Sequence, residues 1–120
     1  MKKTGILILA HGSREKETES TLETVLSMVK AKLPETIVEY AFMEFSDRTI
    51  EKGVSALAAQ AVEEIKIVPY FLFSGIHIKE DIQNRVTRCA ANFPHLTIAL
   101  GNTLGADERL ADILVDRIRS

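Results

Sequence analysis

The chain has 120 residues, of which 46% are hydrophobic and 27% charged, and 15 basic against 17 acidic side chains give a net charge of −2. That length fits one domain, and the apolar fraction is that of a globular protein rather than a disordered or fibrous one. The balanced charge, with no dense run of Lys or Arg, argues against nucleic acid as a partner. We therefore expect a single domain over residues 1–120 that does not bind nucleic acid.

The first residues lack the pattern of an export signal or a membrane anchor. The apolar run Gly5–Ala10 is shorter than the roughly 7–15 residues of a signal-peptide core and far below the ~20 that cross a bilayer. Cys89 is the only cysteine, so no internal disulfide can form. We expect a cytoplasmic protein that does not associate with membranes.

Apolar runs and helical stripes alternate in the first part of the chain. Gly5–Ala10 is a continuous apolar run, which is typical of a strand covered on both faces. Apolar residues at helical spacing over residues 22–33 predict a helix that ends at Pro34. A second strand is predicted over Thr36–Phe42, and its Glu39 indicates an edge position.

The same alternation continues to the end of the chain. Ser46 or Asp47 could cap a second helix, which has an apolar stripe over residues 50–62. The segments that follow are a strand over Ile65–Phe73, a helix over residues 78–93 ending before Pro94, a short strand over Leu96–Leu100 and a helix with apolar positions from 110 to 118.

Four strand–helix units in succession favour a parallel sheet with right-handed crossovers and helices on both faces. The expected fold class is therefore α/β: one three-layer domain whose four parallel strands take the order 2-1-3-4, wound as in flavodoxin. Pro69 lies inside the third predicted strand, where its missing N–H breaks a ladder bond. It predicts either a bulge or a strand that is regular only on one side of Pro69.

Two of the three histidines follow strands that this order makes neighbours. In such sheets ligands bind beyond the carboxyl ends of the strands where the strand order reverses, here between the first and third strands. His11 directly follows the first strand, and His77 lies in the loop after the third. Gly12 and Gly75 beside them let the backbone approach a ligand closely. Imidazole is a common metal ligand and titrates near neutral pH, so these positions indicate a ligand site.

The plainer alternative is that each of these two histidines caps a helix or satisfies a buried backbone group. His95 precedes the fourth strand at the opposite end of the sheet, and no role is assigned to it. Glu44 and Asp47 follow the second strand, and their alternatives are a solvated strand end and a helix cap. Three cationic residues near the same loops could meet carboxylates, although each also suits a solvated helix start: Arg14, Arg48 and Lys79.

The loop after the third strand is unusually apolar. Core packing explains Phe71, but Phe73, Ile76 and Ile78 near an open crevice would form an exposed apolar patch. Such a patch suits a flat hydrophobic ligand or a partner subunit.

Four blocks of the sequence resemble the small sirohydrochlorin cobaltochelatases. They are Ala10–Arg14, Met43–Ile50, Ser74–Ile82 and, more weakly, Leu100-Gly101. Together the blocks are fairly specific, and the resemblance spans essentially the whole chain. It implies a chelatase-like fold and an enzyme, a lyase of cobalamin biosynthesis, that inserts a divalent metal into the tetrapyrrole sirohydrochlorin. Cobalt is the first expectation, nickel and iron are the alternatives, and no organic cofactor is implied.

The same resemblance implies roles for individual residues. His11 would accept a proton and bind the metal, and His77 would be the second metal ligand. The residues that would line the tetrapyrrole site are Asp47, Leu72, Phe73, Ser74, Gly75, Ile76 and His77. To these we add Glu44 as a proton relay. An imidazole nitrogen that holds a metal is not free to act as a base, so the two roles of His11 require a sequence of events or a different division of labour.

The chain departs from the family pattern at one position, because Asp47-Arg48 stands where the family usually has a Glu-Pro pair. Longer relatives resemble two such domains in one chain, and one small domain walls only half of so large a ligand. The resemblance therefore implies a symmetric homodimer.

Three other functions share single features with this sequence. A histidine phosphatase needs an arginine directly before the histidine, where this chain has Ala10. A flavodoxin-like carrier of flavin mononucleotide has only Gly12-Ser13 in its favour, and the chain has no Trp. A metal carrier that uses His11 and His77 without inserting the ion remains open.

Overall fold

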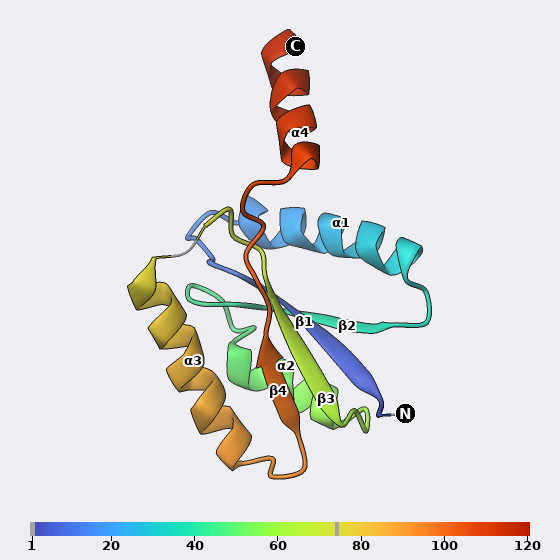
Figure 1. The fold of residues 1–120 in the computed structure, drawn as a ribbon, viewed down its shortest axis with the longest axis vertical. Helices are drawn as coiled ribbons and strands as arrows, with labels where there is room; N and C mark the ends of the chain where they lie inside the picture. The colour runs from blue at the N-terminus through green and yellow to red at the C-terminus, as the bar shows by residue number, and fades with distance from the viewer. Residues whose placement is uncertain (1, 74) are drawn as a thin grey trace.

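Strands and helices alternate along the chain in a computed structural model that describes residues 2–73 and 75–120 (Figure 1). The elements are β1 (Thr4–Ala10), α1 (Glu17–Lys32), β2 (Ile37–Phe42), α2 (Ile50–Ala58), β3 (Glu64–Pro69), α3 (Ile76–Ala91), β4 (Thr97–Leu100) and α4 (Glu108–Arg119). The strands pair in parallel in the order β2-β1-β3-β4, so the predicted α/β class and winding are confirmed. The edge position predicted for the strand containing Glu39 is confirmed as well.

Helices pack on both faces of the sheet. Because side chains alternate along a strand, Leu7 and Leu9 of β1 face the core formed with α2 and α3, whereas Ile6 and Ile8 face α1. This arrangement explains why the first apolar run of the sequence is continuous rather than alternating.

β3 ends at Pro69, earlier than the sequence predicts. Its pairing with β1 is continuous up to Pro69 opposite Leu9, so the proline causes no bulge there. The N–H of Tyr70 donates to the carbonyl of Leu9 at 2.7 Å, which turns the nitrogen of Pro69 toward β4. Pairing with β4 already ends at Ile67, so the missing N–H breaks no ladder bond. The strand is regular only before Pro69, as the second alternative predicts.

α2 begins later than the predicted caps. Thr49 is its N-cap, and the Thr49 side chain accepts a hydrogen bond from the N–H of Lys52 at 3.2 Å. The prediction that Ser46 or Asp47 caps this helix was wrong, because the connection after β2 makes a further turn over these residues before α2 begins. In that turn the hydroxyl oxygen of Ser46 accepts from the N–H of Arg48 at 3.0 Å.

α4 projects from the rest of the protein (Figure 1). Within the described chain none of its residues is buried, and its apolar stripe is exposed, with Leu114 at 63% and Ile118 at 80% of their accessible surface. The segment before it is anchored, since the N–H groups of Leu104 and Gly105 donate to Phe71 and Leu72 at 2.8 Å each. Neither α4 nor any other helix in the described residues is long and apolar enough to cross a membrane.

Candidate metal and tetrapyrrole site

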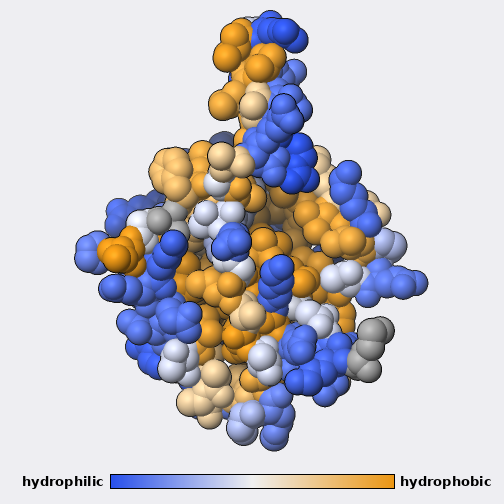
Figure 2. Space-filling view, viewed as in Figure 1, coloured by the Kyte–Doolittle hydropathy of each residue, from blue (hydrophilic) through white to orange (hydrophobic). Residues whose placement is uncertain are grey.

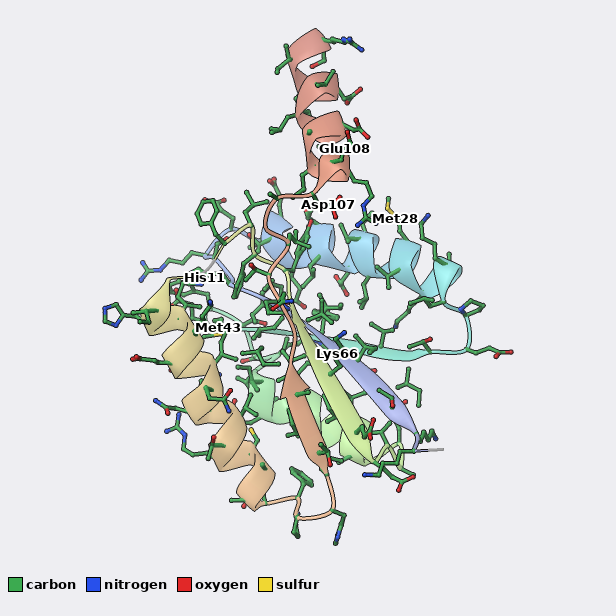
Figure 3. The ribbon with its side chains drawn as sticks, in the orientation of Figure 1. His11, Met28, Met43, Lys66, Asp107 and Glu108 are labelled. Atoms are coloured by element: carbon green, nitrogen blue, oxygen red, sulfur yellow. The ribbon has the colours of Figure 1, made fainter. Side chains whose placement is uncertain are left out.

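The connections after three neighbouring strands meet at one edge of the sheet. His11 follows β1, Glu44 follows β2, and the segment over residues 70–75 follows β3. Because the strands are parallel, their carboxyl ends lie at this same edge. Figure 3 labels His11 and Met43 there, and the N–H of Met43 donates to the carbonyl of Ala10 at 2.9 Å. The first two connections are therefore joined by their backbones.

His11 and Glu44 form a pair at this edge. Their Nε2 and Oε1 atoms lie 3.3 Å apart, and the two side chains are 56% and 50% exposed. The His11 ring also meets the ring of Phe71 edge-on, at 6.3 Å between centroids. An imidazole and a carboxylate at this separation can share a proton or hold a divalent ion between them. The pair is open to solvent, so an incoming metal ion or ligand can reach it.

Gly12 permits this approach. Its φ is +96°, and a Cβ at this position would lie 2.1 Å from the carbonyl oxygen of Glu44. The N–H of Glu44 donates to the carbonyl of His11 at 3.2 Å across the same contact. Gly75 differs, because its φ of −75° is ordinary and no atom of the described chain lies within 4 Å of a Cβ there. The sequence prediction of a tight backbone therefore holds for Gly12 and not for Gly75.

His77 is the second residue of α3, not a loop residue as predicted, because β3 ends four residues earlier than expected and the helix begins at Ile76. Its side chain is exposed. In the part of the chain that the structure describes, His77 makes no hydrogen bond, ion pair or ring contact with His11 or Glu44. No three His, Cys, Asp or Glu side chains among those residues gather into a metal-binding group. The two predicted metal ligands thus lie at the same end of the sheet without touching.

The apolar residues predicted to line the tetrapyrrole site are mostly exposed. Leu72, Phe73 and Ile76 keep 53%, 82% and 68% of their surface. Ile78, expected in the same patch, instead packs partly buried against the core. Ser74 lies outside the described residues.

Two open hollows flank this edge. One, of about 560 Å³, lies between the start of α1 and the connection after β2, and the other, of about 660 Å³, lies between α3 and the segment after β4. Among the described residues neither is lined by His11, Glu44 or His77. The His11–Glu44 pair therefore lies on an open surface rather than in an enclosed pocket.

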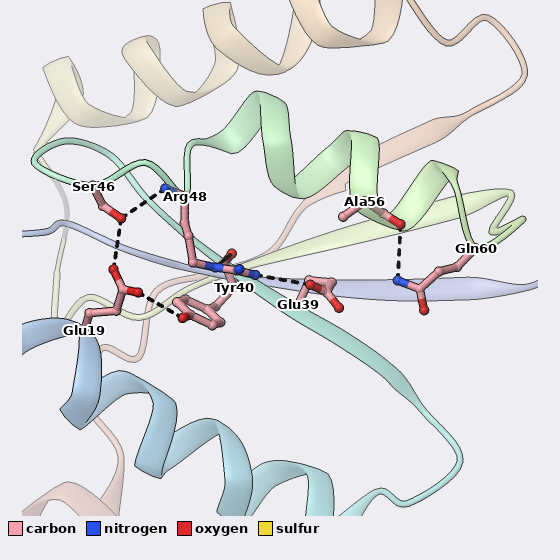
Figure 4. A network of polar contacts seen from close by, with 7 residues as sticks. All are labelled: Glu19, Glu39, Tyr40, Ser46, Arg48, Ala56 and Gln60. Atoms are coloured by element: carbon pink, nitrogen blue, oxygen red, sulfur yellow. Dashed lines mark hydrogen bonds and ion pairs between the residues drawn. The ribbon is translucent and has the colours of Figure 1, made fainter.

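Asp47 is exposed in the connection after β2, and the residue that follows it closes a polar network (Figure 4). The Arg48 guanidinium lies 3.9 Å from the Tyr40 ring centroid and 3.2 Å from the carboxylate of Glu39. The hydroxyls of Tyr40 and Ser46 donate to Glu19 at 3.2 and 3.1 Å. Burial raises the pKa of Tyr40 to about 12, although Arg48 opposes the rise. The carboxylate that pairs with Arg48 is therefore that of Glu39 in the same chain.

Two aromatic residues beside the pair were not predicted as site residues. Phe71, which the sequence suggested was a core residue, contacts the His11 ring. Phe45 has a φ of +61°, is 53% exposed, and lies beneath the guanidinium of Arg14, whose central carbon is 5.0 Å from the Phe45 ring centroid. The only sequence signal for Phe45 is its position directly after Glu44 in the Met43–Ile50 block.

Comparison with known proteins identifies relatives along the whole chain. The CbiX family model matches residues 5–120. The sirohydrochlorin ferrochelatase of Priestia megaterium is 35% identical over 113 residues, which are 94% of this chain and 42% of that protein. The sirohydrochlorin cobaltochelatase of Methanosarcina acetivorans is 30% identical over 125 residues, covering 98% of this chain and 96% of the relative.

A solved structure agrees with these sequence matches. The sirohydrochlorin chelatase SirB of Bacillus subtilis subspecies spizizenii, in complex with cobalt, superposes with a TM-score of 0.90 at 32% identity, covering 98% of this chain and 50% of that one. This chain spans about half or less of the ferrochelatases and of SirB, and nearly the full length of the Methanosarcina protein. With a family model matched from residue 5 to residue 120 and the same fold in SirB, the chain belongs to the CbiX family.

Proposed function

We propose that this protein is a chelatase that inserts a divalent metal ion into sirohydrochlorin at the edge of the sheet that carries His11. The observation that carries the proposal is the 3.3 Å approach of His11 Nε2 to Glu44 Oε1 on an open surface of a CbiX-family chain. The relatives are named for insertion of iron or cobalt into this same tetrapyrrole. We take cobalt as the metal, since relatives that are covered over nearly their full length by this chain are named cobaltochelatases.

The reaction releases the two pyrrole N–H protons as the divalent ion exchanges water ligands for the four nitrogens of the macrocycle. His11 and Glu44 would hold the ion with open coordination positions, which the macrocycle nitrogens then fill. Because a metal-bound imidazole nitrogen is not a free base, the carboxylate oxygen of Glu44 that does not hold the ion would pass the released protons to solvent. His77 would be a further ligand, reached through the bound macrocycle. The exposed Leu72, Phe73 and Ile76 offer an apolar surface on which a flat macrocycle can lie.

The site is expected to be completed by a second copy. The His11–Glu44 pair has open surface around it, and one small domain does not enclose a macrocycle. The apolar stripe of α4 is exposed, while an apolar hollow of about 240 Å³ lies beside α1, lined among others by Leu22, Val25 and Val68. Figure 2 shows apolar side chains along one side of α4 and on the domain below it. The segment before α4 is hydrogen-bonded to the domain, whereas α4 itself projects from it (Figure 1), so the apolar side of α4 is free to pack in the hollow of a partner.

Sedimentation tests the homodimer. The wild-type protein should sediment as a dimer, and Leu114→Glu, which places a charge in the apolar stripe of α4, should sediment as a folded monomer. Asp112→Asn, on the same helix, is the matched control and should remain dimeric. A monomeric wild type at working concentration would contradict the proposal.

The insertion assay is anaerobic incubation of sirohydrochlorin with Co²⁺, Ni²⁺ or Fe²⁺, followed by its visible spectrum. The wild-type protein should accelerate the spectral change, most strongly with Co²⁺. His11→Ala should abolish the acceleration and His77→Ala should slow it severely. His95→Ala, which removes the third histidine before β4, should leave the rate unchanged. Equal rates with and without protein would reject the chelatase, and metal binding without any acceleration would favour a metal carrier instead.

The expected cytoplasmic location stays a prediction that rests on sequence composition. Fractionation of cells expressing the natural chain would test it, and recovery in the membrane fraction would contradict it.

A further inference from the structure

We propose that Arg85 is a positioning residue, which fixes the Glu44 carboxylate relative to the helix that carries His77. The proposal rests on the function proposed above, because it concerns the same metal site. Arg85 lies in the middle of α3, and sequence analysis assigned it no role.

Arg85 joins three elements through one side chain. Its Nη1 donates to the backbone carbonyl of Met43, in the connection after β2, at 2.9 Å. Its Nε and Nη2 donate to the two carboxylate oxygens of Glu51 in α2, each at 3.3 Å. The side chain is only 14% exposed. The planar guanidinium group of an arginine has enough N–H donors to make these three hydrogen bonds at once, whereas the ammonium group of a lysine cannot make them in this geometry.

The peptide that Arg85 binds directly precedes Glu44. The N–H of Met43 donates to Ala10 at 2.9 Å, and the N–H of Glu44 donates to His11 at 3.2 Å. The backbone before Glu44 is therefore held from the β1 side by its N–H groups and from α3 by the Met43 carbonyl. Loss of the hydrogen bond from Arg85 to the Met43 carbonyl would let the connection after β2 move, and the Glu44 carboxylate would move with it.

The same helix carries His77 eight residues before Arg85, which corresponds to about 12 Å along a helix. Because α3 moves as one body over that distance, the bond from Arg85 to Met43 sets where His77 stands relative to Glu44. Burial has the largest single effect and opposes ionisation of Glu51, but the hydrogen bonds and charge of Arg85 act together with bonds from the Glu51 backbone and Thr49 to lower the pKa of Glu51, so the pair stays charged at neutral pH. Arg85 is thus held in place by Glu51 while it holds Met43.

A double-mutant cycle on Co²⁺ affinity tests the proposal, with binding measured by calorimetry on the full chain. Arg85→Lys should weaken Co²⁺ binding about tenfold, the scale seen when a group that orients a metal ligand is lost. In a Glu44→Gln background the same change should have no further effect, because Arg85 acts through Glu44. Arg88→Lys is the matched control, since Arg88 is exposed on the same helix. It should leave the affinity within twofold of wild type.

The outcomes separate this proposal from the proposed function. Additive losses in the cycle, or unchanged binding by Arg85→Lys, would overturn the positioning role while leaving insertion untouched. A coupled cycle with no metal insertion would reject the chelatase and keep the positioning role, and a wild type that does not bind Co²⁺ overturns both. Should Arg85→Lys fail to fold, Glu51→Gln takes its place: it weakens the hold on Arg85, should lower Co²⁺ affinity severalfold, and should lose its effect when Glu44→Gln is present.

Discussion

Replacing Gly12 with alanine tests how the chain brings His11 and Glu44 together. A Cβ at this position would lie 2.1 Å from the Glu44 carbonyl oxygen, and the residue has a φ of +96°. Carbon and oxygen atoms that are not bonded normally come no closer than roughly 3.3 Å, so the two connections must separate by about 1 Å. The hydrogen bond from the Glu44 N–H to His11, 3.2 Å long, does not survive such a shift.

The cost can be estimated from these two effects. A left-handed backbone costs an L-residue roughly 1–2 kcal/mol, and the lost hydrogen bond adds about 1 kcal/mol, so Gly12→Ala should reduce the free energy of unfolding by about 2–3 kcal/mol. Gly105→Ala is the control for the backbone alone, because Gly105 has a φ of +59° and no described atom within 4 Å of a Cβ. It should lose roughly 1–2 kcal/mol. Gly75→Ala, with an ordinary φ and open space but at the N-cap of α3, where alanine is a poor cap, should lose no more than about 1 kcal/mol.

Urea unfolding followed by circular dichroism measures all three variants, and the metal-insertion rate is then measured for Gly12→Ala and Gly105→Ala under conditions where both are folded. Gly12→Ala should insert metal at least tenfold more slowly than wild type, and Gly105→Ala at the wild-type rate. The reasoning is refuted if Gly12→Ala is as stable as Gly75→Ala and inserts metal at the wild-type rate.

Two further predictions concern the polar network after β2. Burial raises the pKa of Tyr40 from 10.0 to about 12, so unfolded Tyr40 ionises first in alkali; its contribution to stability is full below pH 10 and lost as the pH rises toward 12. Tyr40→Phe should therefore flatten the alkaline fall of the urea midpoint, and an unchanged fall would contradict the assignment. Arg48→Ala removes the contacts with Glu39 and Tyr40 and should cost about 1 kcal/mol of unfolding free energy, since Arg48 is partly exposed. Arg109→Ala, which removes an exposed ion pair with Asp107, should leave the free energy of unfolding unchanged. Equal losses of unfolding free energy in Arg48→Ala and Arg109→Ala would show that the Arg48 contacts add no stability.

Sequence patterns predicted the architecture because its signals are local. The continuous apolar run of β1 and the stripe of α2 each reflect burial of that segment, and strand–helix alternation then restricts the topology. The end of β3 was missed because apolar residues continue past Pro69 to Phe73, although pairing stops at the proline. This error placed His77 in a loop rather than in the first turn of α3.

The shared edge of His11 and Glu44 could be predicted from the sequence, but the geometry of the pair could not. Topology brings His11 and Glu44 to one edge, yet the 3.3 Å approach depends on the positive φ of Gly12 and on backbone bonds between connections. The role of Arg85 depends on a tertiary contact with a backbone carbonyl, which leaves no mark in the sequence. An apolar stripe such as that of α4 looks the same whether it packs on its own domain or on a partner, so its exposure could not be foreseen.

The central claim is that His11 and His77 belong to one metal site, although they do not touch in the described chain. Because the protein has only three histidines, the ring nitrogen signals of ¹⁵N-labelled protein can be followed individually while Zn²⁺, a diamagnetic divalent probe, is added in the presence of sirohydrochlorin. Ligation changes the shift of the bound nitrogen. The account predicts that His11 and His77 change together, in proportion to one equivalent of metal, while His95 does not. A change confined to His11, or equal changes at all three histidines, would contradict it.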